Sequence, residues 1–369
     1  MNTTYIHELP DWRAFRWDHA RLAAPLAAAR HLQGRLIGQM AALGCELQEQ
    51  AILGTLTTDV LESSEIEGEQ LDADQVRSSV ARRLGLEIAG LVPADRRVDG
   101  VVEMMLDATQ RYDQPLTTER LFGWHAALFP TGRSGMHPIM VGAWRGDRSS
   151  PMQVVSGPVG RERVHFEAPA AARLDREMRS FIEWFNGDSS TEPVLKAAKA
   201  HLWFVTVHPF DDGNGRIARA IADMALARSE ESAHRFYSMS AQIRQERAGY
   251  YRILEETQQG SMDITPWMMW FLDCLTRAIA RAQSALSGVI AKGRYWEKLR
   301  AVTLNERQRQ MIARLLDGFD GKLTTSKWAA LTKSSQDTAL RDIQQLVDRG
   351  VLMRNAAGGR STSYALAPL

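Results

Sequence analysis

Residues 208–219 of this 369-residue chain read HPFDDGNGRIAR, and this stretch decides the fold. Apolar residues recur at helical spacing over 194–207, ahead of it, and again over 217–225, behind it. The first helix is expected to end at Pro209, because proline cannot continue a helix, and the second to begin near Gly215. The sequence therefore predicts a corner between two helices, with the quoted residues at its turn.

The side chains of this corner suit a polyphosphate. The segment Gly213–Gly215 lies at a predicted helix N-terminus, where backbone N–H groups and the helix dipole favour an anion. Arg216 and Arg219 are three residues apart on the first turn, so both guanidiniums can reach one anion. Asp212 supplies a hard oxygen ligand of the kind that Mg²⁺ prefers, and His208 can take a proton from a hydroxyl. The residues predict a Mg²⁺–polyphosphate site with a general base.

Simpler interpretations of these residues exist. A Gly-Asn-Gly sequence is commonly only a turn, and a lone histidine is commonly structural. The number of distinct chemical roles within one turn favours a site instead. A Walker A loop is excluded, because no Gly-Lys-Ser/Thr follows the glycines. A zinc ion held by His201, His208 and Asp212 is an alternative that no cysteine or second acid supports.

The stretch resembles the signature of the Fic family, His-x-Phe-x-(Asp/Glu)-Gly-Asn-Gly-Arg-x-x-Arg, and meets every fixed position. The resemblance implies a mainly α fold, with a helical core and a β-hairpin flap, that transfers AMP from ATP to a hydroxyl side chain of a target protein. It implies that His208 is the base, that Asp212 binds Mg²⁺ and that Arg219 reaches the γ-phosphate. The ATP-binding residues that it implies in this stretch are Asp212, Gly213, Asn214, Gly215, Arg216, Ile217, Ala218 and Arg219.

A second short motif lies upstream, where residues 63–68 read SSEIEG at the end of a predicted helix over 46–66. By itself it is an acidic helix end with a glycine cap. Beside the signature it resembles the family's inhibitory motif, Ser/Thr-x-x-x-Glu-(Gly/Asn), through Ser63, Glu67 and Gly68. The resemblance implies that Glu67 pairs with Arg219, occupies the space that the γ-phosphate needs, and inhibits the enzyme from its N-terminal side.

A β-hairpin is predicted where residues 153–155 and 163–166 flank a turn that reads GPVG. It could be an ordinary surface hairpin. In the Fic family this position is the flap, whose edge aligns the target segment by strand addition. The resemblance therefore implies that a target protein docks along Val154–Phe166. The flap residues implied to border ATP are Val164, His165, Phe166 and Glu167.

Helical periodicity continues on both sides of the hairpin. A predicted helix over 240–258 contains Tyr250 and Tyr251. Aromatic pairs in helices commonly belong to the core, although the resemblance implies that one of these rings flanks the adenine. The loop over 130–151 is expected to approach the site. Further predicted helices cover 98–112, 117–128, 173–186 and 263–286.

The N-terminal region, through about residue 45, is rich in aromatic and aliphatic side chains such as Trp12, Phe15 and Trp17. They predict a packed cap, with a ligand cage as the alternative. A Gly/Pro-containing linker is expected over 87–95. The expected domains are 1–112, a helical region with the inhibitory helix; 113–292, the catalytic core; and 297–369.

Residues 297–369 have a different pattern. Three predicted helices, 303–316, 327–331 and 335–348, precede two β-prone segments, which resembles a winged helix of the α+β class. Its basic residues could contact DNA phosphates, whereas acidic residues in the third helix dilute that charge. The basic residues are Arg341, Arg349, Arg354 and Arg360, and the acidic ones are Asp337, Asp342 and Asp348. A role in protein docking or in a homodimer is an equal alternative.

The composition indicates a soluble, cytoplasmic protein. The 45 basic and 44 acidic residues nearly balance, so the net charge indicates binding neither to nucleic acid nor to an anionic membrane. The two cysteines, Cys45 and Cys274, lack metal spacing and suit a reducing compartment. No signal-peptide pattern is seen, and the longest apolar stretch, 264–280, is interrupted by charges and is too short to span a bilayer.

Two classes of function follow. The first is a Mg²⁺- and ATP-dependent protein adenylyltransferase that modifies Ser, Thr or Tyr hydroxyls of a target protein and of itself, restrained by Glu67. The second is a DNA-binding regulator with the Fic core as a nucleotide-sensing scaffold. The intact His208 favours the enzyme, because binding alone requires no base. Transfer from another nucleotide, transfer of phosphocholine and removal of AMP are further alternatives.

Overall fold

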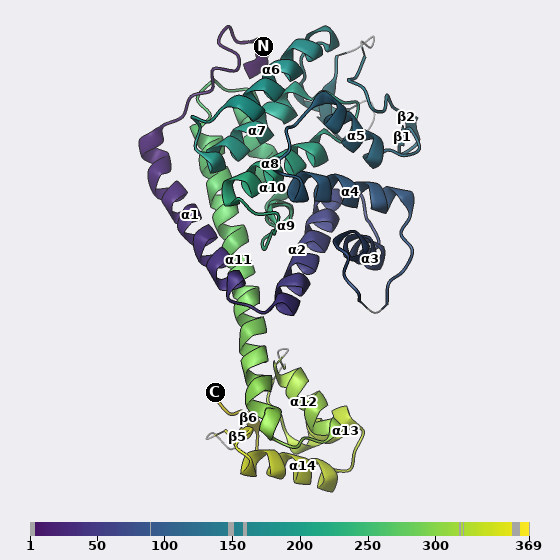
Figure 1. Cartoon of the computed structure of the whole chain (residues 1–369), viewed down its shortest axis with the longest axis vertical. Helices are drawn as coiled ribbons and strands as arrows, with labels where there is room; N and C mark the ends of the chain where they lie inside the picture. The colour runs from purple at the N-terminus through teal and green to yellow at the C-terminus, as the bar shows by residue number, and fades with distance from the viewer. Residues whose placement is uncertain are drawn as a thin grey trace. The chain divides into compact units, whose positions relative to one another are not determined.

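The computed structural model describes residues 4–88, 90–146, 151–157, 161–316, 319, 321–355 and 362–368. The fold is mainly α, as predicted, and the strands of the described residues form three short two-stranded antiparallel sheets (Figure 1). The chain divides into two compact units, residues 1–283 and 284–369. Within the described part of the chain, every helix is too short or too polar to span a bilayer.

The first unit contains most of the helices and both hairpins of the site. Its helices are α1 His19–Ala41, α2 Cys45–Ile66, α3 Ala73–Leu84, α4 Arg96–Gln110, α5 Thr118–Leu128, α6 Leu174–Gly187, α7 Pro193–Val207, α8 Asn214–Glu230, α9 Met239–Gln245, α10 Arg247–Gln258 and the first part of α11, Thr265–Lys298. Its strands are β1 Arg133–Ser134, β2 His137–Pro138, β3 Gln153–Ser156 and β4 Arg163–Glu167. Short 3₁₀ turns cover Ile6–Glu8 and Ala171–Arg173, and a third, Leu299–Ala301, lies in the second unit.

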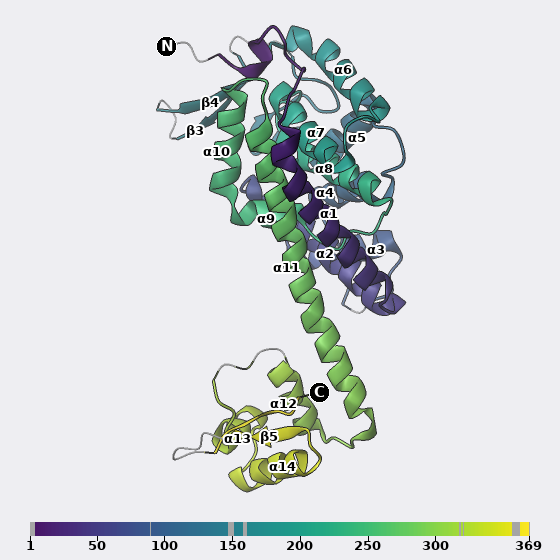
Figure 2. The same ribbon diagram turned by 90° about the vertical axis from the view of Figure 1, so that its left-hand side faces the viewer.

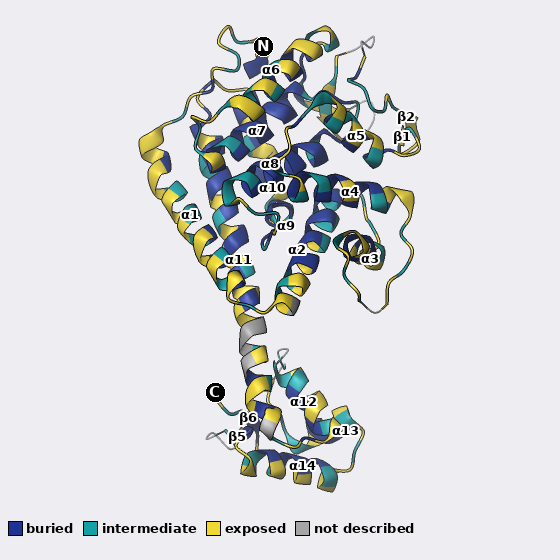
Figure 3. Ribbon diagram, viewed as in Figure 1, coloured by how far each residue is buried: buried dark blue, intermediate teal, exposed yellow. Residues whose placement is uncertain are grey.

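Helix α7 forms the centre of the first unit, beside α8 (Figures 1 and 2). Between Val194 and Val207 every residue except Lys196 is buried, and Figure 3 shows both helices mostly in the colour of buried residues. A helix that is apolar on all sides has to be enclosed by other elements. The predicted corner therefore follows directly after an enclosed helix.

The aromatic side chains of the N-terminal region pack around a lysine of the core. The ammonium of Lys199 lies 4.4 Å from the ring centroid of Trp184, 5.7 Å from that of Phe15 and 5.9 Å from that of Trp17. Burial lowers the pKa of Lys199, and cation–π contacts of this kind favour its charged form. These aromatic residues thus form a cap over α7, and the side chain that lies among their rings is Lys199, which belongs to α7.

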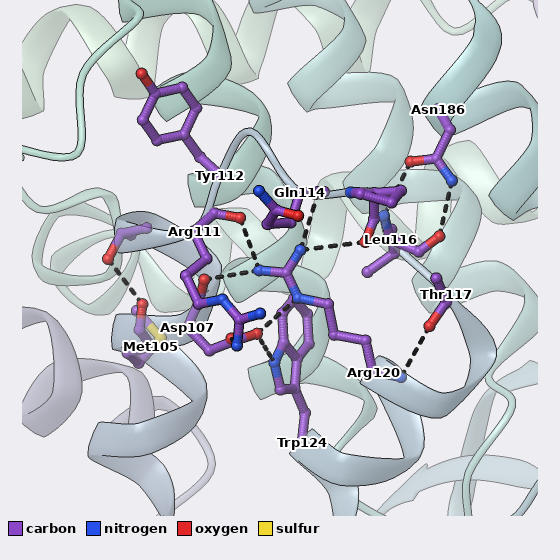
Figure 4. A network of polar contacts seen from close by, with 12 residues as sticks. Met105, Asp107, Arg111, Tyr112, Gln114, Leu116, Thr117, Arg120, Trp124 and Asn186 are labelled. Carbon is purple, nitrogen blue, oxygen red and sulfur yellow. Dashed lines mark hydrogen bonds and ion pairs between the residues drawn. The ribbon is translucent and has the colours of Figure 1, made fainter.

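Arg120 of α5 holds the connection between α4 and α5 (Figure 4). Its guanidinium pairs with the Asp107 carboxylate at 2.6 Å and donates to the carbonyl oxygens of Asp107 and Arg111, at 2.7 and 3.0 Å. These carbonyls lie at the C-terminal end of α4, where the regular helical hydrogen bonds end. Asn186 bonds both backbone groups of Leu116, at 2.9 and 2.7 Å. The network fixes α5, whose C-cap, Phe129, lies under the corner.

The structure corrects three details of the predicted helices. Helix α3 was not predicted, although Asp72 caps its start and Gly85, at φ 70°, ends it. The helix predicted over 240–258 is two helices, α9 and α10, separated at Glu246, whose backbone leaves the helical region and whose carboxylate holds Arg277 at 2.5 Å. Helix α11 continues beyond residue 286 to Lys298, through Gly288 and Gly293, and its last turns contribute Tyr295 to the core of the second unit.

The β-prone segments 153–155 and 163–166 form the predicted hairpin, β3 with β4. The turn between them lies outside the described residues, apart from Gly157. Val154 pairs with Phe166 and Val155 pairs with Val164, so His165 is an extra residue of β4, in a β-bulge. The loop over 130–151 reaches the corner as predicted, since the Arg145 N–H donates to the Pro209 carbonyl at 2.9 Å.

The second unit has three helices followed by a hairpin, the order predicted for it. These elements are α12 Glu306–Leu316, α13 Thr325–Thr332, α14 Gln336–Asp348, β5 Leu352–Arg354 and β6 Tyr364–Leu366. Its core is built on fully buried Trp328, Ile343 and Leu346. Asp342, expected to dilute a basic surface, is itself buried and pairs with Arg307 at 2.8 Å. Arg360 lies outside the described residues, and the winged-helix assignment stays a prediction.

Candidate active site

The corner has the predicted form. Helix α7 ends at His208, which takes the left-handed conformation at φ 50° and ψ 59°. Helix α8 begins at Asn214, and its N-cap, Gly213, has φ 80°. A Cβ atom at Gly213 would lie 2.9 Å from the Phe129 ring, so both the conformation and the space require glycine. The first N–H groups of α8 are therefore directed toward the turn.

Asn214 closes the turn with its side chain. Its Oδ1 accepts from the Phe210 N–H at 3.0 Å, and its Nδ2 donates to the Phe210 carbonyl at 2.8 Å. The Phe210 ring is buried and stacks on His125 at 4.2 Å. The Asn214 side chain thus fixes the shape of the turn between α7 and α8. The side chains of Ile217 and Ala218 are also fully buried, so only their backbone could contact a nucleotide.

His208 is held by Arg145, which the sequence interpretation missed. The Arg145 Nε donates to the His208 carbonyl at 2.8 Å, and its Nη2 donates to the Pro169 carbonyl at 2.5 Å. The imidazole Nδ1 lies 3.3 Å from the Val205 carbonyl, which can only accept, so Nδ1 carries the proton and Nε2 is an acceptor. Burial lowers the pKa of His208 to about 4. His208 is therefore a neutral base at physiological pH.

Asp212 is placed for a hard cation. Its Oδ1 accepts from the Gly213 N–H at 2.6 Å, and its Oδ2 accepts from the Ser134 hydroxyl. The described residues contain no group of three His, Cys, Asp or Glu side chains able to hold a metal. One carboxylate beside a hydroxyl fits Mg²⁺, which usually keeps waters and phosphate oxygens as its other ligands. The alternative zinc set does not converge, because the buried His201 Nε2 bonds the Tyr250 hydroxyl at 2.8 Å.

Arg219 is fully engaged by the end of α2. Its Nη1 lies 2.8 Å from the Glu67 Oε1, the ion pair that the inhibitory motif implied. Its Nε donates to the Ser63 hydroxyl at 3.0 Å, and its Nη2 donates to the Ser63 carbonyl at 2.8 Å. Both residues of the motif thus contact one guanidinium, which is buried with its side chain 2% exposed.

The Glu67 carboxylate lies against the N-terminal turn of α8. A Cβ atom at Gly215 would be 2.3 Å from the Glu67 Oε1, so this approach requires glycine. A helix N-terminus favours an anion, and here a carboxylate of the chain occupies that position. Glu67 therefore uses both the arginine and the helix end that the resemblance assigned to phosphates.

A second carboxylate, not predicted, holds the other signature arginine. The Glu69 Oε2 lies 2.6 Å from the Arg216 Nη1, and the Arg216 guanidinium lies 5.1 Å from the Phe129 ring centroid. Gly68, at φ 82°, reverses the chain after α2, and the Glu69 N–H donates to the Ser64 carbonyl at 3.0 Å. This Schellman-type end turns Glu67 and Glu69 toward the two arginines.

A cavity of about 990 Å³ adjoins the corner and is large enough for a nucleotide. Glu67, His208 and Gly215 form one side, and the β3–β4 hairpin and α10 form the others. Of the predicted flap residues, His165 and Phe166 line the cavity, whereas Val164 and Glu167 do not. Tyr250 is buried and only 2% exposed, whereas Tyr251 is 38% exposed and offers a ring to the cavity. The lining residues that the sequence interpretation missed include Ser156, Arg163, Arg247 and Glu255.

Comparisons with known proteins point to the same family. Residues 115–226 match the Fic/DOC family model, and residues 5–86 match a domain of unknown function, DUF4172. The protein adenylyltransferase Fic of Drosophila willistoni is 35% identical over 113 residues, and that of Drosophila ananassae is 34% identical over 113 residues. The match covers 30% of this chain and 21% of each of these curated relatives.

Solved structures show the same fold. A Fic family protein from Desulfovibrio desulfuricans G20 superposes with a TM-score of 0.52 at 20% identity, over 93% of this chain and 96% of that protein. A Fic-domain-containing signaling protein from Bacteroides thetaiotaomicron superposes with a TM-score of 0.52 at 22% identity, over 71% of this chain and 97% of that protein.

Proposed function

We propose that this chain, a Fic-domain protein, is a protein adenylyltransferase that transfers AMP from ATP to hydroxyl side chains of a target protein. The observation that carries the proposal is His208, a neutral base with Nε2 as an acceptor, at the border of a nucleotide-sized cavity. Arg216, Arg219 and the N-terminus of α8 lie beside it and supply the positive potential for a triphosphate. Neither feature is needed by a protein that only binds a partner.

In the reaction, His208 takes the proton from the acceptor hydroxyl through Nε2. The hydroxyl oxygen forms a bond to the α-phosphorus, the bond from that phosphorus to the bridging oxygen breaks, and pyrophosphate leaves. Arg145 keeps the imidazole in place through the His208 carbonyl. Asp212, with the Ser134 hydroxyl, would hold Mg²⁺, which neutralises phosphate charge when bound. The exposed ring of Tyr251 is the candidate to flank the adenine.

Glu67 would restrain this reaction through its ion pair with Arg219. Arg219 cannot bind a γ-phosphate and keep its ion pair with Glu67, because one guanidinium edge cannot satisfy both anions. ATP would then bind with its phosphates displaced from the in-line arrangement, and a displacement of this kind can cost about 10²-fold in rate. Inhibition would thus act on geometry more than on affinity.

The target segment would add to the edge of the β3–β4 hairpin. Val155 and Val164, paired across the two strands, are both exposed, and a two-stranded sheet leaves main-chain groups for a third strand. Strand addition would carry a hydroxyl side chain along the cavity toward His208. The hairpin would thus align the target segment through main-chain hydrogen bonds, with little dependence on the target's sequence.

The proposal is tested by incubating the chain and its Glu67→Gly variant with Mg²⁺ and ATP radiolabelled on the α-phosphate, in a cell extract. Labelling of other proteins by the variant, at roughly 10²-fold the wild-type rate, is expected because Arg219 is released. ATP labelled on the γ-phosphate should add no label beyond that produced by the kinases of the extract alone, since pyrophosphate departs. DNA binding without transfer of label by either protein would support the regulator instead.

A further inference from the structure

A second hydrogen-bonded histidine lies on the flap, apart from the signature. The Ser156 hydroxyl lies 2.6 Å from the His165 Nε2, and the His165 Nδ1 lies 2.7 Å from the Glu255 Oε2. Ser156 belongs to β3, His165 to β4 and Glu255 to α10. A serine, a histidine and a carboxylate in this order form the arrangement that activates a hydroxyl in nucleophilic enzymes.

The direction of the hydrogen bonds is set by the carboxylate. Burial raises the pKa of Glu255, but the hydrogen bonds from His165 and Arg163 outweigh it and the resulting pKa is lowered, so the carboxylate is ionised. An ionised carboxylate only accepts, so the His165 Nδ1 carries a proton, and in the neutral imidazole Nε2 is then the acceptor for the Ser156 hydroxyl. The Arg163 Nη2 lies 2.6 Å from the Glu255 Oε1 and holds the carboxylate from its other side.

The β-bulge explains how one strand presents this histidine. As the extra residue between Val164 and Phe166, His165 is released from the regular alternation of side chains along β4. Its ring can therefore lie between Ser156 and Glu255. A bulge is costly to the sheet, since it interrupts the ladder, and bulges are common where a side chain has to be redirected near an active site.

The three residues open onto the cavity that His208 and Glu67 line. Ser156 is exposed there. Another exposed serine, Ser190, instead donates its hydroxyl to the Asp188 carboxylate, at 2.7 Å. A hydroxyl with its own base thus faces the space proposed for the nucleotide.

We propose that Ser156 is an acceptor site for AMP on the chain itself, with His165 as its base. This inference rests on the proposed use of ATP. The Ser156 Oγ forms a bond to the α-phosphorus of bound ATP, the bond to the bridging oxygen breaks, and pyrophosphate leaves. The hydroxyl proton moves to the His165 Nε2, the ionised Glu255 balances the imidazolium charge, and the proton then passes to water.

This assignment gives the two histidines different acceptor hydroxyls. His208 serves hydroxyls of other proteins aligned along the flap, and His165 serves the flap's own serine. Modification of Ser156 would place a bulky anion at the mouth of the cavity, beside the edge proposed for the target. Self-modification would therefore lower transfer to other proteins.

The first test measures nucleophilicity without ATP. The full chain is treated with an alkyl fluorophosphonate, and the modified residue is located by peptide mass spectrometry. Modification at Ser156 is expected, with a rate that falls by about 10²-fold in His165→Gln and is unchanged in Ser190→Ala. If Ser156 stays unmodified, or reacts equally fast in His165→Gln, the hydrogen-bond chain only fastens the flap to α10 and the inference is wrong.

The second test locates AMP after incubation of the Glu67→Gly variant with Mg²⁺ and ATP. AMP is expected on Ser156, still present when His208→Ala is added and lost when His165→Gln is added. AMP found only on other residues would overturn the assignment while leaving the proposed function intact. Reaction of Ser156 with the fluorophosphonate, together with no AMP on any protein, would instead overturn the proposed use of ATP and the assignment of Ser156 as an AMP acceptor.

Discussion

The end of α2 and the corner between α7 and α8 meet through two ion pairs, yet they hold their charges differently. The arginines of the corner, Arg216 and Arg219, have side chains that are 2% exposed, whereas those of Glu69 and Glu67 are 29% and 31% exposed. Arg219 also keeps two hydrogen bonds to Ser63 that do not depend on Glu67. The guanidiniums are thus enclosed parts of the site, whereas the carboxylates are partly open to solvent.

The two carboxylates lie where α2 ends, outside its packed turns. Glu67 is the C-cap of α2, and Gly68 follows it in the left-handed conformation. A change in a few backbone angles at such a helix end moves the side chains without disturbing the packed helix. By contrast, α8 is buried along most of its length, so Arg219 cannot leave without opening the core. Under the proposed function, exchange of the Glu67 carboxylate for a phosphate would activate the site without moving Arg219.

The largest expected effect on AMP transfer comes from removing the base at the corner, His208. In the Glu67→Gly background, His208→Ala should lower AMP transfer to other proteins by about 10²–10⁴-fold, because no neutral acceptor then faces the hydroxyl. ATP affinity measured by calorimetry should stay nearly constant. The exposed His31→Ala on α1 is the control and should transfer normally. Equal rates for the two variants would remove His208 from the mechanism.

The fixed arginine can be tested in the same background. Arg219→Ala combined with Glu67→Gly should lose the gain of roughly 10²-fold, because the γ-phosphate then has no anchor whatever the carboxylate does. The double variant also avoids leaving an unpaired Glu67 beside α8, so its circular dichroism should match that of the single variant. Transfer that stays at the level of Glu67→Gly would show that Arg219 only receives the inhibitory contact.

Substitution of Glu69 should have a smaller effect on transfer, and it tests whether the two ion pairs contribute differently. Glu69→Gln should raise transfer by less than about tenfold, because a partly exposed ion pair contributes roughly 0–1 kcal/mol. Arg216 would also keep its contact with the Phe129 ring. Glu65→Gln is the matched control, since Glu65, in the last turn of α2, pairs with Arg244 of α9 at 2.5 Å. A rise as large as that of Glu67→Gly would make Glu69 an equal partner in the restraint.

The buried histidines predict an effect on folding stability, which is lost in acid. Burial lowers the pKa of His125 and His208 to about 4 and that of His201 to about 3, from an ordinary 6.5. Below about pH 6.5 the unfolded chain therefore binds more protons than the folded one, and stability is lost as the pH falls. Urea unfolding at about pH 7 and about pH 5 should show this slope, reduced in His208→Gln. The same slope in wild type and His208→Gln would contradict the assignment for that histidine.

Much of the fold was predictable from local patterns. The end of α7 and the start of α8 follow from Pro209 and from the glycines of the turn, because proline and left-handed glycine restrict the backbone locally. The β3–β4 hairpin follows from two β-prone segments around a turn. Helix α3 carried equally clear signals, Asp72 and Gly85, and its absence from the prediction was an omission.

The sequence by itself determined which chemical groups stand at the corner, because the signature packs them into one turn and the turn's geometry is local. Only the tertiary structure decided what reaches them from elsewhere. Arg145 binds the His208 carbonyl from a distant loop, Glu69 reaches Arg216 across 147 positions, and Glu255 meets His165 across 90. Such contacts depend on how helices pack, and no periodicity along the chain records which surface side chains the packing brings together.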